Sequence, residues 1–497
     1  MKKLINGILK ALGVLLIVLS VAGYGFYAYL FEREHKYYEV EDPLVKEKLD
    51  EWQGLKFGLF LHWGTYSQWG IVESWSLCAE DEPWCVRNSD NYEQYKRDYT
   101  ALKTTFNPTR FDPEKWAEAA SHAGMKYVVF TTKHHDGFCM FDTKTTDYKI
   151  TSPDVPFSQH PRANISKELF DAFRDEGFMI GAYFSKPDWN SEYFWWPNFA
   201  TPDRNANYRI DKYPERWQSY VDFAHTQVDE LMTDYGRIDI LWLDGGWVRP
   251  LRPIEASISG FVDGIFRDSG YTQLNIPQSQ DMQIAKMAAM AREKQPGLVM
   301  VDRYVEGKEE NYLTPENHVP GDYNPHRWES SLTMHGGVSL SPDATYRSTR
   351  EIIHSLIDVV SKNGNLLLNI GPGPDGTWHD EAYEKLEEIG EWLDVNGSAI
   401  YGTRGREKFG EGKVSFTQND DGSLNAIYRA DEAESGPPAE IEIRSIDVTK
   451  STRVSMLGVG ELEWTETSDG LVVKIPEATQ EEPPCAFAWS FRITNSS

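Results

Sequence analysis

The sequence contains few cysteines, and this limits how the fold can be held together. Only four occur in 497 residues, Cys78, Cys85, Cys139 and Cys485. So few cysteines exclude a disulfide-built scaffold, and none stands in a C-x-x-C or Cys/His spacing typical of zinc sites. In an oxidising compartment Cys78 and Cys85, which share one loop, could pair, or both could remain thiols.

Basic residues are scarce relative to acidic ones. The chain has 50 lysines and arginines against 77 aspartates and glutamates, a formal net charge of −27. Such a charge repels nucleic acid and anionic lipid surfaces, so we expect no nucleic-acid partner. Internal repeats are absent from the sequence, and its one low-complexity tract is the acidic, proline-containing stretch 431–438.

One long uncharged run stands at the N-terminus. Lys2, Lys3 and Lys10 precede it, and 21 uncharged residues follow over 11–31. Residues 1–31 therefore read as an export segment, either a retained transmembrane anchor or a signal peptide cleaved after the small residues at 20–22. Lysines before the run place the rest of the chain outside the cytoplasm, periplasmic or extracellular, with membrane contact only through this segment.

The order of apolar runs predicts the fold class. Short apolar runs alternate with amphipathic stretches, one of which carries helix start signals at Asp112 and Pro113. This alternation predicts an α/β protein with a (β/α)8-like TIM barrel over 40–402, although an open doubly wound sheet fits the periodicity too. Six strands are evident, within 56–62, 127–131, 179–184, 238–243, 298–301 and 365–370.

The pattern changes after Gly402. Short alternating segments such as 414–416, 441–443, 472–475 and 487–491 are separated by Gly, Asp and Pro. They predict an antiparallel β-sandwich over residues 403–497. A catalytic barrel of about 250 to 400 residues with one accessory domain also fits the length of the chain.

Polar residues follow four of the predicted barrel strands directly. His62 follows the first, His134 and His135 the second, Asp244 closes the fourth, and Arg303 follows the fifth. In a barrel the carboxyl ends of the strands build the active site, so we expect these side chains to converge. Any one of them alone is more typical of a structural residue.

Their types suit a sugar, whose hydroxyl groups need directional polar partners and whose ring faces pack on tryptophan. Trp242, beside Asp244, is the preferred platform. Hydrolysis of a glycosidic bond needs two carboxyl groups. Asp244 suits the nucleophile, because a strand end holds it rigidly and cationic neighbours keep its pKa low. Spacing alone does not choose the acid between Glu316 and Glu329, both expected in loops.

Several stretches of the sequence together form a recognisable pattern. They are 56–64 (KFGLFLHWG), 106–108 with 111–113, 133–138 (KHHDGF), 242–245 (WLDG), 302–303, 314–316 (TPE) and 363–372 (NGNLLLNIGP). The histidine-pair motif and the Asn-Leu-Leu-Leu-Asn stretch are long and specific. In this order, across roughly residues 50 to 405, the stretches resemble the α-L-fucosidases of glycoside hydrolase family 29.

The resemblance implies an exo-acting retaining α-L-fucosidase without metal or organic cofactor, acting on fucosylated oligosaccharides or glycoconjugates. It makes Asp244 the nucleophile and favours Glu316 as acid/base, with Glu329 as the alternative. A homo-oligomer is left open. The residues that the resemblance assigns to fucose binding or to its pocket are His62, Glu73, Trp75, His134, His135, Tyr183, Trp242 and Arg303.

Two departures from the family pattern bear on specificity. Ser74 is inserted in the Glu-Trp pair formed by Glu73 and Trp75, so that correspondence is looser. The aromatic segment that the family carries after its Trp-Glu stretch is missing, and His335-Gly-Gly-Val-Ser-Leu340 stands there instead. This puts substrate preference in question, since the missing aromatic would help to wall the sugar pocket.

Two other classes of function compete. A non-catalytic fucose- or glycan-binding envelope protein would use the same pocket, but it would not need both carboxylates. A metal-dependent hydrolase could use His62, His134 and His135 as ligands, but the neighbouring cations Lys133 and Arg303 disfavour a metal ion there.

Overall fold

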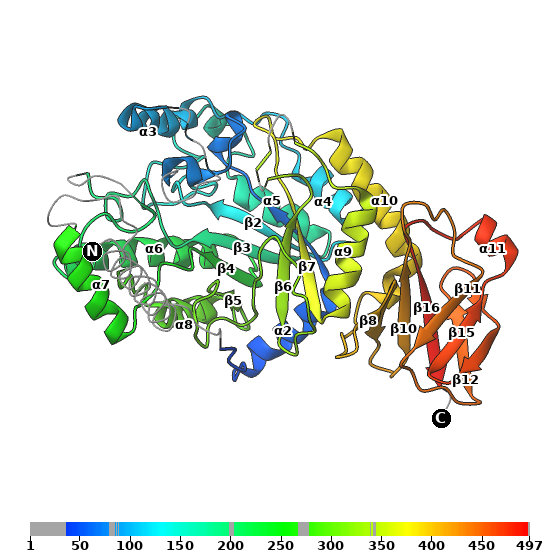
Figure 1. Ribbon diagram of the computed structural model, residues 1–497. Helices are drawn as coiled ribbons and strands as arrows, with labels where there is room; N and C mark the ends of the chain where they lie inside the picture. The colour runs from blue at the N-terminus through cyan, green and yellow to red at the C-terminus, as the bar shows by residue number, and fades with distance from the viewer. Residues whose placement is uncertain are drawn as a thin grey trace, which may run out of the picture.

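The computed structural model describes residues 36–495, except 79–84, 86, 88, 198–202, 267–277, 338, 341–343 and the side chains of 262–266. A barrel-like α/β part is followed by an all-β part at the C-terminus (Figure 1). The predicted export segment 1–31 lies outside the described residues. Within the described part of the chain, no helix is both long and apolar enough to cross a bilayer.

A curled parallel sheet forms the centre of the first part. Its strand order is β5-β4-β3-β2-β1-β7-β6, and all of its neighbouring pairs are parallel. Sequential strands that lie side by side in this way, with helices between them, are typical of a TIM-like barrel. The strands are β1 (Phe57–Leu61), β2 (Tyr127–Lys133), β3 (Met179–Ser185), β4 (Ile240–Asp244), β5 (Val299–Val301), β6 (Trp328–Thr333) and β7 (Gly364–Ile370).

The sheet has seven strands rather than the eight of an ideal barrel. Residues 311–317, which we call the bridging segment, occupy the gap between β5 and β6. The Asn311 N–H donates to the Met300 carbonyl at 2.9 Å, and the Glu329 N–H donates to the Leu313 carbonyl at 2.8 Å. Pro315 in this segment has no N–H to donate, which explains why its pairing stays irregular.

Strand β6 corrects one expectation. The stretch around Glu329 was expected to be a loop, yet Trp328–Thr333 is a strand that pairs with β7. It escaped prediction because Glu329, Ser330 and Ser331 interrupt any apolar run, although Glu329 and Ser330 are almost fully buried. Polar residues are tolerated inside a barrel when the opposite strands supply hydrogen-bond partners.

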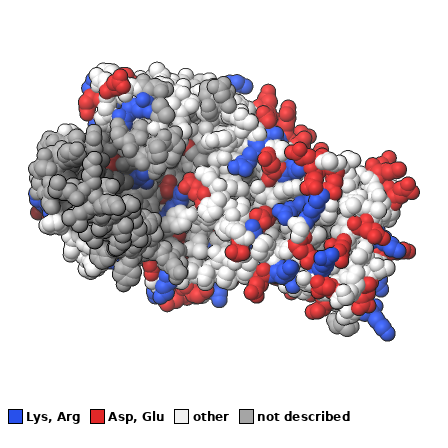
Figure 2. Space-filling view, in the orientation of Figure 1, with Lys and Arg blue, Asp and Glu red and all other residues white. Residues whose placement is uncertain are grey.

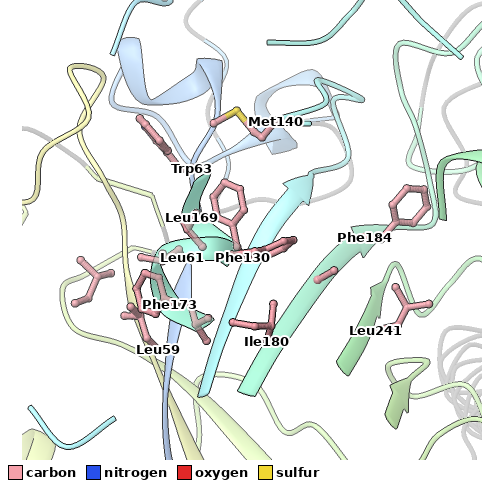
Figure 3. Packing of buried hydrophobic residues seen from close by; sticks show 14 of the residues in the cluster. Leu59, Leu61, Trp63, Phe130, Met140, Leu169, Phe173, Ile180, Phe184 and Leu241 are labelled. Atoms are coloured by element: carbon pink, nitrogen blue, oxygen red, sulfur yellow. The ribbon is translucent and has the colours of Figure 1, made fainter. Parts of the chain in front are cut away.

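The two faces of the sheet pack against different partners. Leu59, Leu61 and Phe130 belong to the core between the sheet and its helices. In Figure 3 they lie beside Leu169 and Phe173 of helix α5 (Ile165–Asp175). Each such side chain, once fully buried, contributes about 1.5 to 3 kcal/mol to stability. The alternate residues of the strands face the barrel interior and form a separate cluster, which includes Phe60, Val129, Tyr183, Trp242 and Val301.

The helices begin where the sequence provides caps. Asp112 accepts a hydrogen bond from the Lys115 N–H at 3.2 Å, and Ser348 forms a capping box with Glu351. The expected helix start at Asp112 is therefore confirmed. Besides α5, the α-helices of this part among the described residues are α2 (Pro43–Leu55), α3 (Tyr92–Ala101), α4 (Pro113–His122), α6 (Pro214–Asp234), α7 (Pro253–Phe266), α8 (Ile284–Lys294), α9 (Thr349–Ser361) and α10 (Asp380–Asn396).

The C-terminal part is built from two antiparallel sheets, as expected for a β-sandwich. One has the order β13-β12-β16-β10-β9-β8 and the other β11-β15-β14. Their inward residues form one core, which includes Phe416, Ile441 and Trp489. The strands are β8 (Gly410–Glu411), β9 (Val414–Gln418), β10 (Leu424–Arg429), β11 (Glu440–Arg444), β12 (Thr452–Met456), β13 (Gly460–Glu461), β14 (Trp464–Thr467), β15 (Gly470–Lys474) and β16 (Ala488–Asn495), with a short helix α11 (Glu477–Glu481).

Helices α9 and α10 join the two parts. The Trp392 indole donates to the Ala488 carbonyl at 2.9 Å, and His354 pairs with the Phe487 carbonyl at 3.0 Å. Buried Ile427 and Ala488 belong to the barrel core rather than to that of the sandwich. The C-terminal part is thus packed on the side of the barrel by apolar contacts and hydrogen bonds. Figure 2 shows acidic and basic side chains interspersed over its visible face.

Candidate active site

A cavity of about 1100 Å³ opens at the carboxyl ends of the barrel strands. Its size is near the upper end of the range for small-molecule sites, about 300 to 1,000 Å³, so it can hold more than one sugar ring. The charged and aromatic residues that line it are Phe60, His62, Glu73, Trp75, His134, His135, Arg204, Asp244, Trp247, Arg303, Glu316, His335, Tyr346, Arg347 and Glu351. Most of the expected site residues are therefore brought together.

Two of the histidines present hydrogen-bond acceptors to this cavity. The Ser185 hydroxyl donates to the Pro187 carbonyl at 2.5 Å, so its oxygen accepts from His135 Nδ1 at 2.8 Å. His62 Nδ1 likewise donates to Asn369 Oδ1 at 2.7 Å. Because burial lowers the pKa of each ring to about 4, both are neutral at pH 7. Their Nε2 atoms are left to accept from hydroxyl groups.

His134 is fixed between its neighbours. Its Nδ1 lies 2.6 Å from the Ser74 hydroxyl, which also accepts from the Asp136 N–H at 3.0 Å. The ring stacks on Tyr183 with centroids 5.7 Å apart and planes 6° from parallel. Burial lowers its pKa well below the ordinary value, and neighbouring His135 lowers it further. The inserted Ser74 therefore orients a histidine of the site.

Asp244 is the last residue of β4 and is held by several donors. Tyr183 donates to Oδ2 at 2.7 Å, while the Gly245 N–H at 2.7 Å and Arg303 at 3.1 Å donate to Oδ1. Burial alone would raise its pKa, but the charge of Arg303, the proximity of His135 and these hydrogen bonds lower it to about 2. Asp244 is therefore a fixed, ionised carboxylate.

The turn after Asp244 requires glycine. Gly245 has φ +89°, and a Cβ there would lie 2.4 Å from Pro187 Cδ. A side chain at this position would displace the turn and with it the N–H that donates to Asp244. Asp244 thus both starts this turn and faces the cavity.

Arg303 connects the two carboxylates expected to be catalytic. Its Nη1 bonds Asp244, and its Nη2 forms an ion pair with Glu316. The guanidinium also lies over the Trp242 ring, 5.0 Å from its centroid. The Asp244 side chain is 13% exposed and that of Glu316 45%. Glu316 therefore reaches the cavity from its rim.

Glu73 is a third carboxyl group in the cavity wall. It is 2% exposed, and its Oε1 has no hydrogen-bond partner among the described residues. Burial raises its pKa to about 8, with smaller contributions from the charges of Glu316 and Asp244. Glu73 is thus protonated at pH 7 and able to donate a hydrogen bond to a bound hydroxyl.

Glu329, the alternative acid, lies elsewhere. It is 1% exposed inside the barrel, where it accepts from the Tyr127 hydroxyl at 2.7 Å and the Trp242 indole at 3.1 Å. Trp242 is itself 1% exposed and stacked on Tyr183. Trp242, the expected sugar platform, therefore lies behind the cavity wall. Trp75 and Trp247 line the cavity, and their rings are 5.5 Å apart.

Comparison with known proteins fits this geometry. The sequence model described as alpha-L-fucosidase matches residues 28–398, more than half of the chain. The chain belongs to the α-L-fucosidase family. A second model, described as the α-L-fucosidase C-terminal domain, matches residues 413–494. The family and the enzyme class expected from the sequence, a glycosidase, are confirmed.

Individual fucosidases resemble the chain over most of its length. Human tissue α-L-fucosidase is 28% identical over 462 residues, covering 88% of this chain and 87% of that protein. The structure of α-L-fucosidase isoenzyme 1 from Paenibacillus thiaminolyticus is similar at a TM-score of 0.69 and 27% identity, covering 91% of this chain and all of that one. The Thermotoga maritima α-fucosidase in complex with fucose gives a TM-score of 0.66 at 25% identity, covering 90% and 98%.

The departure from the family pattern at residues 335–340 falls in the cavity wall. His335 is 1% exposed, and its ring packs edge-on against Tyr346 with centroids 5.4 Å apart. Neither ring nitrogen has a hydrogen-bond partner among the described residues. Ser339 Oγ accepts from the Glu73 N–H at 3.4 Å. This segment thus supports the Glu73 loop.

Some residues of the cavity were not expected from the sequence. Arg204 lies over Trp75 at 4.9 Å and over Trp247 at 5.1 Å, and it closes one side. Asn369 closes the Asn-Leu-Leu-Leu-Asn stretch and is the partner of His62. Its position near the carboxyl end of a predicted strand was a usable signal. Arg204 stands in a long connection whose path no periodicity reveals.

One grouping could hold a metal ion on geometric grounds. Ligand atoms of His134, His135 and Asp244 lie within 4.8 Å of one another. This set differs from the three histidines considered from the sequence, because Asp244 replaces His62. Asp244 already bonds the Arg303 guanidinium at 3.1 Å, and a second cation would be repelled there. The absence of a metal from the reaction stays a prediction.

Proposed function

We propose that this chain is an exo-acting, retaining α-L-fucosidase that releases terminal α-L-fucose from glycans. The observation that carries the proposal is Asp244, whose carboxylate has a pKa of about 2 and faces a cavity lined by neutral histidines. An ionised carboxylate fixed in this way is what a retaining glycosidase needs as its nucleophile.

The proposed reaction has two steps. In the first, an Asp244 oxygen attacks the anomeric carbon, the bond to the leaving oxygen breaks, and Glu316 gives that oxygen its proton. In the second, Glu316 takes a proton from water, the water oxygen attacks the anomeric carbon, and the ester bond to Asp244 breaks. Two inversions at one carbon give net retention.

The position of Glu316 supports its assignment over Glu329. Glu316 lies at the cavity rim, where a leaving group would depart, and shares Arg303 with the nucleophile. Its half-exposed side chain can turn toward a glycosidic oxygen once substrate displaces it from Arg303. Glu329 is buried beneath Trp242 and accepts hydrogen bonds from the Tyr127 hydroxyl and the Trp242 indole. No sugar reaches it without rearrangement of the barrel interior.

The fucosyl ring would be held by the groups around Asp244. His62 and His135 offer acceptors for its hydroxyl groups, and protonated Glu73 offers a donor. His134 and Arg303 lie in the same wall, with Trp75 and Trp247 as apolar surface. Tyr183 and Trp242 act from behind, by supporting Asp244 and Arg303.

A direct assay tests the proposal. The purified chain should release p-nitrophenol from p-nitrophenyl α-L-fucoside. Proton NMR spectra recorded in the first minutes should show α-L-fucose forming before mutarotation. Early formation of the β-anomer would exclude retention. Binding of fucose without any turnover would instead favour the glycan-binding envelope protein.

We also propose that the enzyme works outside the cytoplasm, in the periplasm or extracellular space. The support is the uncharged run 11–31, which Lys2, Lys3 and Lys10 precede. Its substrates there would be fucosylated oligosaccharides or glycoconjugates, like those implied by the family. The retained anchor, the cleaved signal peptide and a homo-oligomer remain predictions, which fractionation and sizing of the full chain would test.

A further inference from the structure

The turn that carries Arg303 has an unusual backbone. Arg303 has φ 38° and the next residue, Tyr304, has φ 63°. L-residues with side chains rarely adopt a positive φ, and two in succession persist only where the surroundings hold them. This turn sends the Arg303 guanidinium to both Asp244 and Glu316. Its geometry therefore bears directly on the proposed chemistry.

One buried carboxyl group holds both flanks of this turn. Glu310, 2% exposed, accepts from the Asp302 N–H through Oε2 at 2.8 Å and from the Tyr304 N–H through Oε1 at 3.0 Å. The two amides it holds lie on either side of Arg303. Glu310 itself belongs to a stretch that the next residue, Asn311, ties to strand β5.

Other contacts leave the turn little freedom to relax. The Asp302 carboxylate pairs with buried Lys186. On the other side, a Cβ at Gly246 would lie 2.2 Å from the Arg303 carbonyl oxygen, so glycine there permits the turn to pass close to β4. These contacts fix the position of the turn, whereas Glu310 fixes the direction of its two amide groups.

We infer that Glu310 is a positioning residue that holds Arg303 between the proposed nucleophile and the proposed acid/base. The inference rests on the proposed function for its catalytic meaning. Glu310 touches neither substrate nor the reacting atoms, and it acts through the backbone of the Asp302–Tyr304 turn. Removing one of its oxygens should let the guanidinium withdraw from at least one carboxylate.

The test compares two neighbouring variants. Burial raises the pKa of Glu310 to about 8, but both of its oxygens accept a backbone N–H, which is the arrangement of an ionised carboxylate. Glu310→Gln keeps one acceptor oxygen and loses the other, since an amide NH2 cannot accept. Glu309→Gln is the matched control, because Glu309 pairs with Arg292 of α8 and lies outside the turn. We expect Glu310→Gln to lower kcat/KM about tenfold to a hundredfold, the scale of a small misplacement of a catalytic group. Glu309→Gln should stay within about twofold of the wild type.

A pH profile separates positioning from general damage. The pKa of Asp244 is lowered by Arg303, and also by His135, Tyr183 and the Gly245 N–H. A displaced guanidinium should therefore move the acidic limb of the kcat/KM profile of Glu310→Gln to higher pH. The melting temperature should stay close to that of Glu309→Gln. An acidic limb identical to the control overturns the inference, and so does an activity loss that only follows unfolding.

A structural readout does not depend on turnover. Crystal structures of the wild type and of Glu310→Gln should differ in the contacts from Arg303 to Asp244 and Glu316. If both contacts persist in the variant, Glu310 is not a positioning residue. If the wild type releases no fucose while Arg303 moves in the variant, the proposed function fails and the positioning role stands.

Discussion

Asp244 and Glu316 share one arginine but are held in opposite ways. Asp244 closes strand β4 and receives donors from Tyr183, Gly245 and Arg303. Glu316 lies on the irregular bridging segment, and its side chain is more than three times as exposed, 45% against 13%. A nucleophile must be aimed at one carbon, whereas an acid/base must serve a departing group and then a water molecule.

The largest expected effect is on the rigid side of this comparison. Asp244→Gly should lower kcat by about 10⁴-fold or more, because the covalent step has lost its nucleophile. External azide should then restore turnover by entering the space left by the carboxylate. Substantial activity of the variant without azide would show that Asp244 is not the nucleophile.

Glu316→Ala should have a smaller and more selective effect. General acid–base catalysis contributes about 10² to 10⁴-fold to the rate. We expect the rate to fall by this factor on a substrate with a poor leaving group, such as a fucosyl disaccharide. A dinitrophenyl fucoside releases dinitrophenolate, which needs no proton to leave. With this substrate the first step should be nearly normal. Measuring both substrates separates the acid role from binding.

Glu329→Gln is the matched control for that prediction. Glu329 is buried and bonded to Tyr127 and Trp242, so its loss should affect both substrates equally and lower the melting temperature. The opposite pattern, with leaving-group dependence in Glu329→Gln and none in Glu316→Ala, would transfer the acid role to Glu329.

Tyr183→Phe tests how tightly Asp244 is held. Removing the 2.7 Å hydrogen bond should lower kcat/KM about tenfold, since a hydrogen bond to a charged group is worth about 1.5 to 3 kcal/mol. It should also raise the pKa of Asp244, so activity at acidic pH should fall first. Tyr312→Phe, which removes a buried hydroxyl that donates to Glu329, should leave the acidic limb in place.

The third carboxyl group, Glu73, is expected to affect stability rather than turnover. Its pKa is about 8 in the folded chain against an ordinary 4.5. The unfolded chain therefore loses this proton first, and stability falls as pH rises from about 4.5 to 8. Glu73→Gln should remove that slope and raise the free energy of unfolding at pH 8, on the order of 3 kcal/mol.

Urea melts at pH 5 and pH 8 measure this difference. The gain should be larger at pH 8, and it should be accompanied by weaker fucose binding if Glu73 contacts the sugar. Equal stability of Glu73→Gln and the wild type at both values would mean that Glu73 is ionised in the folded chain.

The residues that could be predicted share a physical reason. Strands such as 179–184 are continuous apolar runs, and the groups that end them necessarily meet at one rim of a barrel. Strand β6 could not be found in this way, because Glu329 owes its burial to Tyr127, which lies 202 positions away in sequence. The pairing of Ser185 with His135 is equally invisible to local spacing, whereas Asn369 stands near the carboxyl end of a predicted strand.

The predicted role of Trp242 shows a related limit. Its place two residues before Asp244 correctly indicated the same face of β4, since alternate residues of a strand point to one side. Trp242 lies deeper in the barrel, where it stacks on Tyr183, while Trp75 and Trp247, in the segments that follow β1 and β4, reach the cavity. Which tryptophan meets the sugar is decided by tertiary structure.

The bridging segment has a consequence for engineering. Residues 311–317 replace a regular strand and are held by a few backbone hydrogen bonds rather than by a full ladder. Asn311, Tyr312 and Thr314 of this segment are buried, whereas Glu316 and Asn317 are exposed. A library limited to the exposed end of this segment, with Glu316 kept, could vary leaving-group range while the strand that carries Asp244 stays untouched. The strands of the barrel would then stay constant, and only the bridging segment would vary.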